Sequence, residues 1–305
     1  MGEFRTYRSS GERHLRAALH QVVRYRVEKE RSRFIERAAT ACIALCLLAS
    51  LARAQQASPA PSPTLDPQDL AKSVHNPFED FVKVPIQAAT GFNVGQHHSA
   101  GEAVNVQPVI PFSLNADWDL IARPSLTVTY TPSPSSQFGL NDLQTAFYLT
   151  PAKAGEWIWG VGPILEFPIA SSTDLGTGRW SGGPTAALIY SQGRWFNGVL
   201  AYHLMSYAGD RRRGSVNLTY IEPDVSYNFD SGWYVQIDPP ITYDWTAEMK
   251  DAWVLPVGAD VGKAFNLGPQ AMSLQLGSYD FVKHPEGGPG WMIRASATLL
   301  FPTGK

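Results

Sequence analysis

Residues 233–245 read WYVQIDPPITYDW. Odd-numbered positions of this stretch carry apolar or aromatic side chains, whereas the even-numbered positions are mainly polar. Because successive side chains of a β-strand point to opposite faces, this alternation predicts a strand with one apolar face. Residues 291–301, WMIRASATLLF, follow the same pattern. It appears again at 118–130, 157–167 and 253–265.

Twelve segments of this kind can be counted, and they are separated alternately by short turns and longer loops. Nothing after residue 84 has helical periodicity, so the pattern predicts an all-β fold. Within 270–283 the apolar positions change from even to odd after Leu276, which predicts a β-bulge in that segment. The twelve segments are roughly 85–95, 103–113, 117–130, 140–150, 156–168, 180–191, 195–207, 215–229, 233–245, 253–265, 270–283 and 291–301.

Eight of the nine tryptophans lie at the ends of these segments. A soluble sandwich would place them in the middle of its strands, inside the core. Tryptophan at both ends of an apolar band is instead typical of the interface girdle of a membrane barrel. The eight girdle residues are Trp118, Trp157, Trp180, Trp195, Trp233, Trp245, Trp253 and Trp291.

An all-strand chain in a membrane must close on itself, because hydrocarbon offers no partner to an unpaired backbone group. An even number of strands, with turns on one side and loops on the other, is the Gram-negative outer-membrane pattern. The sequence therefore predicts an antiparallel transmembrane β-barrel of about twelve strands, over residues 84–302.

The N-terminal part has a different composition. Residues 1–54 hold 11 of the 25 Lys and Arg residues and both cysteines, and their apolar run at 38–51 is too short to span a bilayer. Ala-Arg-Ala follows at 52–54, which predicts a secretory signal peptide with cleavage near Ala54-Gln55. Its basic region is unusually long, so we expect translation to start downstream, at Val22, Val23 or Val27.

The remaining chain begins with a Pro/Ser-rich periplasmic linker and a short helix, over residues 55–83. The helix is expected at 66–75, with Asp66 or Asp69 as its N-cap. From residue 55 onward there are 14 basic and 22 acidic residues and no cysteine, which excludes a disulfide framework and gives no indication of a nucleic-acid partner.

Nine prolines fall inside the predicted strands. Proline cannot donate to a β-ladder, so several of these strands are expected to carry bulges or to end early. The prolines also leave a secreted soluble β-protein open as an alternative. They are Pro108, Pro111, Pro124, Pro163, Pro168, Pro223, Pro239, Pro240 and Pro256.

Several stretches resemble outer-membrane proteins that are grouped with the meta-pathway of phenol degradation and labelled as transporters. They are NVQPVIPFSLNADWDLIARP at 105–124, WGVGPILEFP at 159–168, GWYVQIDPPITYDW at 232–245, VGADVGKAF at 257–265 and GWMIRASATLLFP at 290–302. The resemblance covers about 70–302 and implies an outer-membrane barrel that admits aromatic or other small organic molecules. It brings no catalytic residues. Phe301, four residues before the end, is the aromatic residue that the outer-membrane assembly machinery would read.

The polar faces of the strands are predicted to line the lumen, where acids outnumber arginines eight to two if Asp142 is included. Such a lumen either favours cations or neutral polar solutes, or is narrow and filled by a packed network that pairs the arginines with carboxylates. The candidate lining residues are Asp119, Arg123, Glu166, His203, Glu222, Asp224, Asp238, Asp244, Asp260 and Arg294.

The sequence predicts neither an enzyme nor a cofactor or metal. It contains no Gly-x-Ser-x-Gly motif, and His97-His98 has no second ligand cluster. Arg211, Arg212 and Arg213 form a basic run in a long loop, which either contacts lipopolysaccharide phosphates or is simply solvated.

The predicted function is passive passage of small molecules through the lumen, gated by long loops. The alternative is a non-conducting structural or adhesive outer-membrane protein, plugged by side chains or by residues 69–83. The expected partners are outer-membrane lipid and lipopolysaccharide, the assembly machinery and a small-molecule solute.

Overall fold

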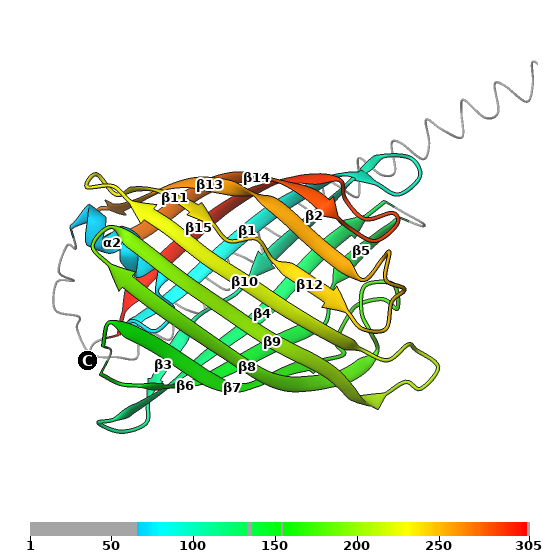
Figure 1. Ribbon diagram of the computed structural model, residues 1–305, viewed down its shortest axis with the longest axis horizontal. Coiled ribbons are helices and arrows are strands. Elements are labelled where there is room, and N and C mark those ends of the chain that lie inside the picture. The colour runs from blue at the N-terminus through cyan, green and yellow to red at the C-terminus, as the bar shows by residue number, and fades with distance from the viewer. Residues whose placement is uncertain (1–65, 133–135, 154, 304–305) are drawn as a thin grey trace, which may run out of the picture. The chain divides into compact units, whose positions relative to one another are not determined.

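The structure is a computed structural model that describes residues 66–132, 136–153 and 155–303. The predicted signal peptide and the first part of the linker lie outside these residues. The described chain forms one short helix and one antiparallel sheet of fifteen strand segments (Figure 1). The segments are β1 (Phe81–Val94), β2 (Ser99–Val106), β3 (Ile110–Ser113), β4 (Trp118–Thr131), β5 (Gln137–Leu140), β6 (Leu143–Pro151), β7 (Trp157–Phe167), β8 (Arg179–Gln192), β9 (Trp195–Gly209), β10 (Asn217–Asn228), β11 (Trp233–Ile237), β12 (Ile241–Asp244), β13 (Trp253–Leu267), β14 (Gln270–Lys283) and β15 (Trp291–Pro302).

The sheet closes into a barrel. Its first and last strands pair in one continuous register from Phe81↔Pro302 to Phe92↔Trp291, and β9 pairs with β10 elsewhere in the ring. Three wall strands are each divided into two segments: β2 with β3, β5 with β6, and β11 with β12. Counting each divided strand once gives the predicted twelve, so the closed antiparallel barrel is confirmed. The first strand begins at Phe81, slightly before the predicted boundary at residue 84, because Phe81 still has a ladder partner.

Two of the divisions fall at prolines, as the sequence predicts. Pro108 lies between β2 and β3, and Pro239-Pro240 separate β11 from β12. The phase change predicted inside 270–283 is wrong. Leu274 and Leu276 are exposed on one face of β14, whereas Tyr279 is buried on the other, so the strand keeps a single phase. The extra residue lies at the end of the strand, where the register with β13 shifts at Val282.

The outer surface of the barrel is apolar along its middle, with exposed residues such as Val199, Leu188 and Leu276. Tryptophans lie at both rims. Trp118, Trp157, Trp195 and Trp233 begin strands at the end where the short turns lie, which we call the turn end. Trp253 and Trp291 begin strands at the opposite loop end, where Trp180 is the second residue of β8 and Trp245 follows β12.

The predicted short helix is present as α2 (Pro67–His75), at the turn end of the barrel in Figure 1. Asp66 is its N-cap: its carboxylate accepts a hydrogen bond of 2.9 Å from the amide of Gln68. Pro67 occupies the first helical position, where no amide donor is required. Among the residues that the structure describes, no helix is long and apolar enough to cross a membrane.

Candidate functional site

Helix α2 packs against the inner wall at the turn end. Leu70 and Ala71 are fully buried in one cluster with Tyr234, Ala264 and Leu300, which come from β11, β13 and β15. These strands are near neighbours in the ring, because β11 pairs with β13 and only β14 lies between β13 and β15, so the helix packs against one side of the inner wall. Burial of its apolar face holds the helix there.

Lys83, on β1, forms hydrogen bonds with the C-terminal end of this helix. Its side chain is only 2% exposed, and its ammonium donates to the carbonyl oxygens of Ser73 and Asn76. The last carbonyls of a helix lack intrahelical partners and carry partial negative charge, so a buried ammonium both satisfies them and stabilises the helix end. The contact ties α2 to the barrel wall.

His75 and Phe78 extend this contact around the wall. The His75 ring lies 4.6 Å from the ring of Tyr234 and 5.7 Å from that of Phe196, centroid to centroid. Burial, followed by the positive charge of Lys83, lowers the pKa of His75 to about 3, so the ring is neutral near pH 7. Phe78 packs edge-on against Tyr148 and over Gly160, where a Cβ would come within 2.7 Å of the Phe78 ring. We call α2 and Phe78 together the plug.

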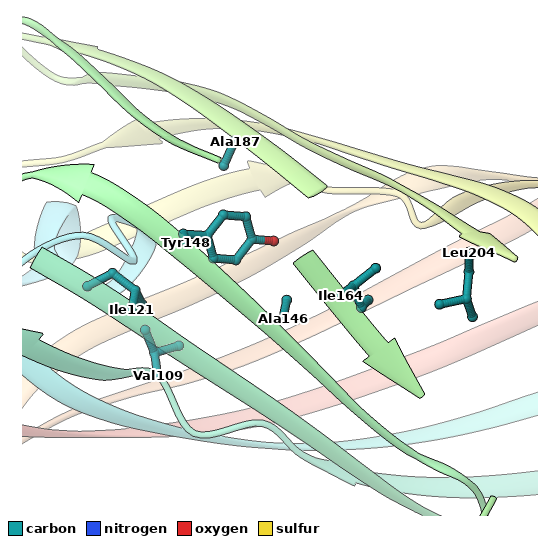
Figure 2. Close-up of a cluster of buried hydrophobic side chains, with 7 residues drawn as sticks. All are labelled: Val109, Ile121, Ala146, Tyr148, Ile164, Ala187 and Leu204. Atoms are coloured by element: carbon teal, nitrogen blue, oxygen red, sulfur yellow. The ribbon is translucent and has the colours of Figure 1, made fainter. Parts of the chain in front are cut away.

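The lumen has an apolar half, built by β4 and by β6 to β9. Among the buried side chains of the hydrophobic cluster in this half, only that of Tyr148 has a hydroxyl group. This hydroxyl accepts a hydrogen bond of 3.0 Å from the hydroxyl of Thr185. Figure 2 shows Val109 on the segment between β2 and β3 and the other cluster members on β4 and β6 to β9. They are Val109, Ile121, Ala146, Tyr148, Ile164, Ala187 and Leu204.

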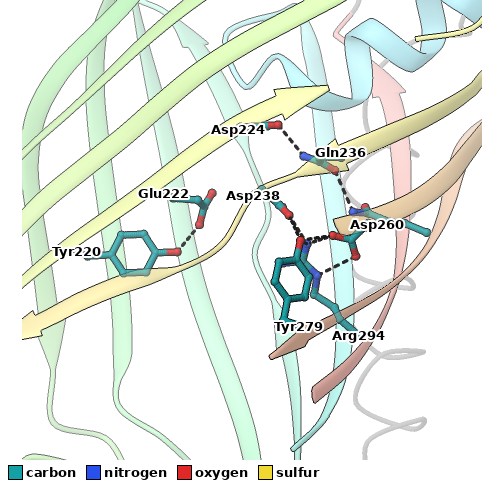
Figure 3. Close-up of polar contacts among 9 residues, drawn as sticks. Tyr220, Glu222, Asp224, Gln236, Asp238, Asp260, Tyr279 and Arg294 are labelled. Atoms are coloured by element: carbon teal, nitrogen blue, oxygen red, sulfur yellow. Dashed lines mark hydrogen bonds and ion pairs between the residues drawn. The ribbon is translucent and has the colours of Figure 1, made fainter. Parts of the chain in front are cut away.

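The other half of the lumen is polar and is built by β10 to β15 (Figure 3). Arg294 pairs with both Asp238 and Asp260, and the hydroxyl of Tyr279 donates to the same two carboxylates. Asp260 is completely buried. Two carboxyl groups therefore share one guanidinium in this cluster.

A cavity of about 490 Å³ lies between the two halves. Its apolar wall includes Tyr148, Ile164 and Phe196, and its polar wall includes Glu222 and Asp224. Val74, His75 and Lys83 line it at the turn end, so α2 forms part of the cavity wall there. A volume of this size is within the range of small-molecule sites.

The loop end is also held together by hydrogen bonds. The carboxylate of Asp142 accepts from the amides of Ala170 and Thr177, at 3.0 and 2.6 Å, and so fixes the loop at 168–178. Arg213, from the loop at 210–216, donates to the carbonyl oxygens of Thr173 and Thr177. A second hollow of about 560 Å³ lies here, lined in part by these two loops.

Nine of the ten candidate lumen residues lie on the inner face or at its loop end. Arg123, Glu222, Asp224, Asp238 and Arg294 line the cavity. Asp260 lies directly against Arg294. Asp119 is buried toward the turn end, Glu166 is buried beneath the loop at 168–178, and Asp244 lines the second hollow.

His203 is the exception, and its predicted place in the lumen is wrong. It shares a face with Val199 and Met205, which are 40% and 46% exposed on the outside. The inner face of β9 carries Phe196 and Leu204 instead. On the outside, His203 Nδ1 lies 2.9 Å from the hydroxyl oxygen of Thr219, so its polarity is satisfied without the lumen.

The sequence reasoning missed the apolar half, the tyrosines of the lumen and Lys83. Tyr202 and Tyr220 both line the cavity, and their rings are stacked at 4.6 Å with 7° between planes. The signal for the apolar half was present in β9, where both faces are largely apolar. Lys83 gives no such signal, because its role depends on the helix that reaches it through space.

The three arginines of the basic run at 211–213 differ in their interactions. Arg213 joins two loops, whereas Arg212 pairs with Asp210 inside its own loop, at 3.1 Å, and Arg211 is exposed. The Arg212 side chain lowers the pKa of the Asp210 carboxyl. Within the described parts of the chain, no group of three or more His, Cys, Asp or Glu side chains is placed to hold a metal ion.

Comparison with known proteins gives structural matches only. No family model matches the chain, and no curated protein does. Among solved structures, the chain is similar to the COG4313 outer membrane channel from Pseudomonas putida F1, with 15% identity over 72% of this chain and 94% of that one and a TM-score of 0.54. The fold is that of an outer-membrane β-barrel. The grouping with phenol degradation remains a prediction.

Two other barrels are more distant matches. The NanC porin has 11% identity over 72% of this chain and 98% of its own, with a TM-score of 0.45. Outer membrane phospholipase A from Escherichia coli has 12% identity over 72% and 95%, with a TM-score of 0.41. A barrel fold alone does not define an activity.

Proposed function

We propose that the chain is a bacterial outer-membrane channel through which small organic molecules pass without an energy source. The observation that carries the proposal is the cavity of about 490 Å³ enclosed by the barrel. The apolar outer surface between two rims of tryptophan supports insertion in a membrane, and the predicted cleavage near Ala54-Gln55 supports export. In this orientation the turn end is periplasmic and the loop end is external.

The two halves of the lumen define what such a passage accepts. Apolar parts of a solute contact the wall around Tyr148 and Ile164, while its polar groups bond to the wall around Glu222 and Asp224. Small organic solutes, including the aromatic ones implied by the family resemblance, combine both kinds of surface. A solute leaves the cavity only when the plug moves, so the gate includes α2 as well as the external loops.

A second candidate is a non-conducting envelope protein. Hydrogen bonds at both ends of the barrel favour this candidate. At the turn end Lys83 bonds to the plug, and at the loop end Asp142 and Arg213 bond to the external loops. In that case the external loops are the functional surface, and Arg211 and Arg212 contact lipopolysaccharide.

Flux into proteoliposomes distinguishes the two candidates. The folded barrel is first identified in the outer-membrane fraction by its heat-modifiable mobility on gels. Lys83→Met removes the two bonds to the helix end and is expected to raise the influx of small organic solutes about tenfold or more, because a bond to a charged group contributes about 1.5–3 kcal/mol. Lys263→Met, on the outer face beside Trp233, is the matched control and should leave flux unchanged. Absence of flux in all three proteins would support the non-conducting candidate.

A further inference from the structure

Two acidic side chains on the polar wall of the cavity are hydrogen-bonded to neutral groups. Glu222 accepts a hydrogen bond from the hydroxyl of Tyr220, and Asp224 accepts one of 2.9 Å from the side-chain amide of Gln236 (Figure 3). Neither carboxylate forms an ion pair with any Lys or Arg of the described residues. Arg294, the cation of this wall, is already shared by Asp238 and Asp260.

Aromatic rings stand beside these carboxylates. Tyr220, which donates to Glu222, is stacked on Tyr202, and both side chains line the cavity. A π face next to a carboxylate is the combination that attracts organic ammonium ions. Tyr148, Phe196 and Leu200 also line the cavity and provide an apolar surface that an aromatic or alkyl group would cover. Leu200 is the cross-strand partner of Glu222, so this surface begins directly beside the carboxylate.

The cavity also contains a polar atom without a partner. His75 is 8% exposed and lines the cavity, and its Nε2 has no hydrogen-bond partner among the described residues. Its ring is neutral near pH 7, so one ring nitrogen can accept a bond from an N–H or O–H group of a bound molecule.

Arg123 places a positive charge on another part of the cavity wall. It lines the cavity from β4, five strands from β10 around the ring, and donates to Gln107 at 3.2 Å. Its positive charge repels an ammonium group, which is therefore directed to the wall that carries Glu222 and Asp224.

We propose that the cavity binds small organic ammonium ions that carry an aromatic or apolar group, with Glu222 and Asp224 holding the ammonium. The aromatic or apolar group lies against the wall formed by Tyr148, Phe196 and Leu200. This inference rests on the proposed function in treating the cavity as part of the passage, but binding is measurable without transport.

Calorimetric titration of the full folded chain in detergent at pH 7.5 tests the charge preference. Four probes of similar size are compared: phenethylamine (cation), 2-phenylethanol (neutral), phenylalanine (zwitterion) and 3-phenylpropionate (anion). Phenethylamine is expected to bind at least about tenfold more tightly than 2-phenylethanol, since bonds to charged groups exceed neutral ones by roughly that factor. The anion should bind most weakly. Equal binding of amine and alcohol, tighter binding of the zwitterion or anion, or no binding of any probe overturns the proposal.

Variants locate the site. Glu222→Gln and Asp224→Asn keep the bonds to Tyr220 and Gln236, and each should weaken phenethylamine binding about tenfold while leaving 2-phenylethanol unchanged. Arg123→Gln should strengthen phenethylamine binding. Asp119→Asn, a buried acid outside the cavity lining, is the matched control and should have no effect. If both carboxylate variants bind phenethylamine as the unaltered chain does, the assignment is wrong.

Flux measured separately keeps the two proposals distinguishable. Selective binding with no flux in proteoliposomes would overturn the channel and leave the site. Flux with no preference for phenethylamine would overturn the site and leave the channel.

Discussion

The apolar and polar halves of the lumen enclose the same cavity but are stabilised by different interactions. In the apolar half, residues such as Ile121 and Leu204 exclude water and fill space, with few directed bonds. In the polar half, Arg294 joins Asp238, Asp260 and Tyr279 in one bonded cluster. A defect in packing is therefore expected to remain local in the first half, whereas the loss of one charge in the second leaves several buried groups without a partner.

Removing the central charge of the polar half should have the largest effect. Arg294→Leu leaves the buried carboxyl group of Asp260 and the partly buried one of Asp238 without their cation, and we expect it to lower the free energy of unfolding by about 3–5 kcal/mol. Urea unfolding from lipid vesicles, followed by tryptophan fluorescence, measures this loss. Adding Asp260→Asn to Arg294→Leu should recover part of the stability. A double variant less stable than the single one would contradict the shared-charge account.

A packing defect in the apolar half should cost somewhat less. Leu204→Ala empties space in the inner cluster, and we expect a loss of about 3 kcal/mol, within the range for buried leucine truncations. Val199→Ala lies on the outer face of the same strand and should cost well under half of that. Equal losses in the two variants would indicate that the inner face of β9 is not packed as described.

This same strand shows how far the sequence alone could predict the site. In β13 to β15 the two faces differ in polarity, so the alternation correctly placed Asp260 and Arg294 inside. In β9 both faces are apolar, and the polar side chain of His203 suggested the wrong face. Period two specifies which residues share a face, but it assigns the inner face only when the two faces differ in polarity.

The sequence predicted less about the plug than about the barrel. The N-cap candidates Asp66 and Asp69 predicted a helix, and residues 69–83 were considered as a plug. What no local pattern shows is the bond from Lys83 to the helix end, because the lysine and its acceptors meet only through the closure of the barrel.

Acidification should loosen the plug through His75. The pKa of this ring is about 3 in the buried state, against 6.5 when free, so the docked state is fully stabilised above pH 6.5 and loses that stability as the pH falls toward 3. At pH 5 the expected loss is about 2 kcal/mol, which should appear as increased flux into proteoliposomes.

His75→Phe keeps a ring against Tyr234 and Phe196 but cannot titrate, so its flux should respond much less to the same change of pH. This control separates His75 from the carboxylates of the polar half. An unchanged pH response in the variant would assign the effect to those carboxylates.

The external basic run should contribute least to stability. Arg211→Gln with Arg212→Gln alters exposed side chains, and we expect the free energy of unfolding to stay unchanged. If these arginines contact lipopolysaccharide, cells carrying the variant become more sensitive to detergent. Unchanged sensitivity would remove that role.

Single-channel recording in planar bilayers tests the central claim most directly, that the lumen is a passage closed by α2. The intact chain is compared with a chain that begins at Pro77 and lacks the helix, both shown to be folded by heat-modifiable mobility. We predict rare, brief openings of the intact chain and frequent, long-lived openings of the shortened one. Absence of openings at any voltage in the shortened, folded barrel would contradict the account.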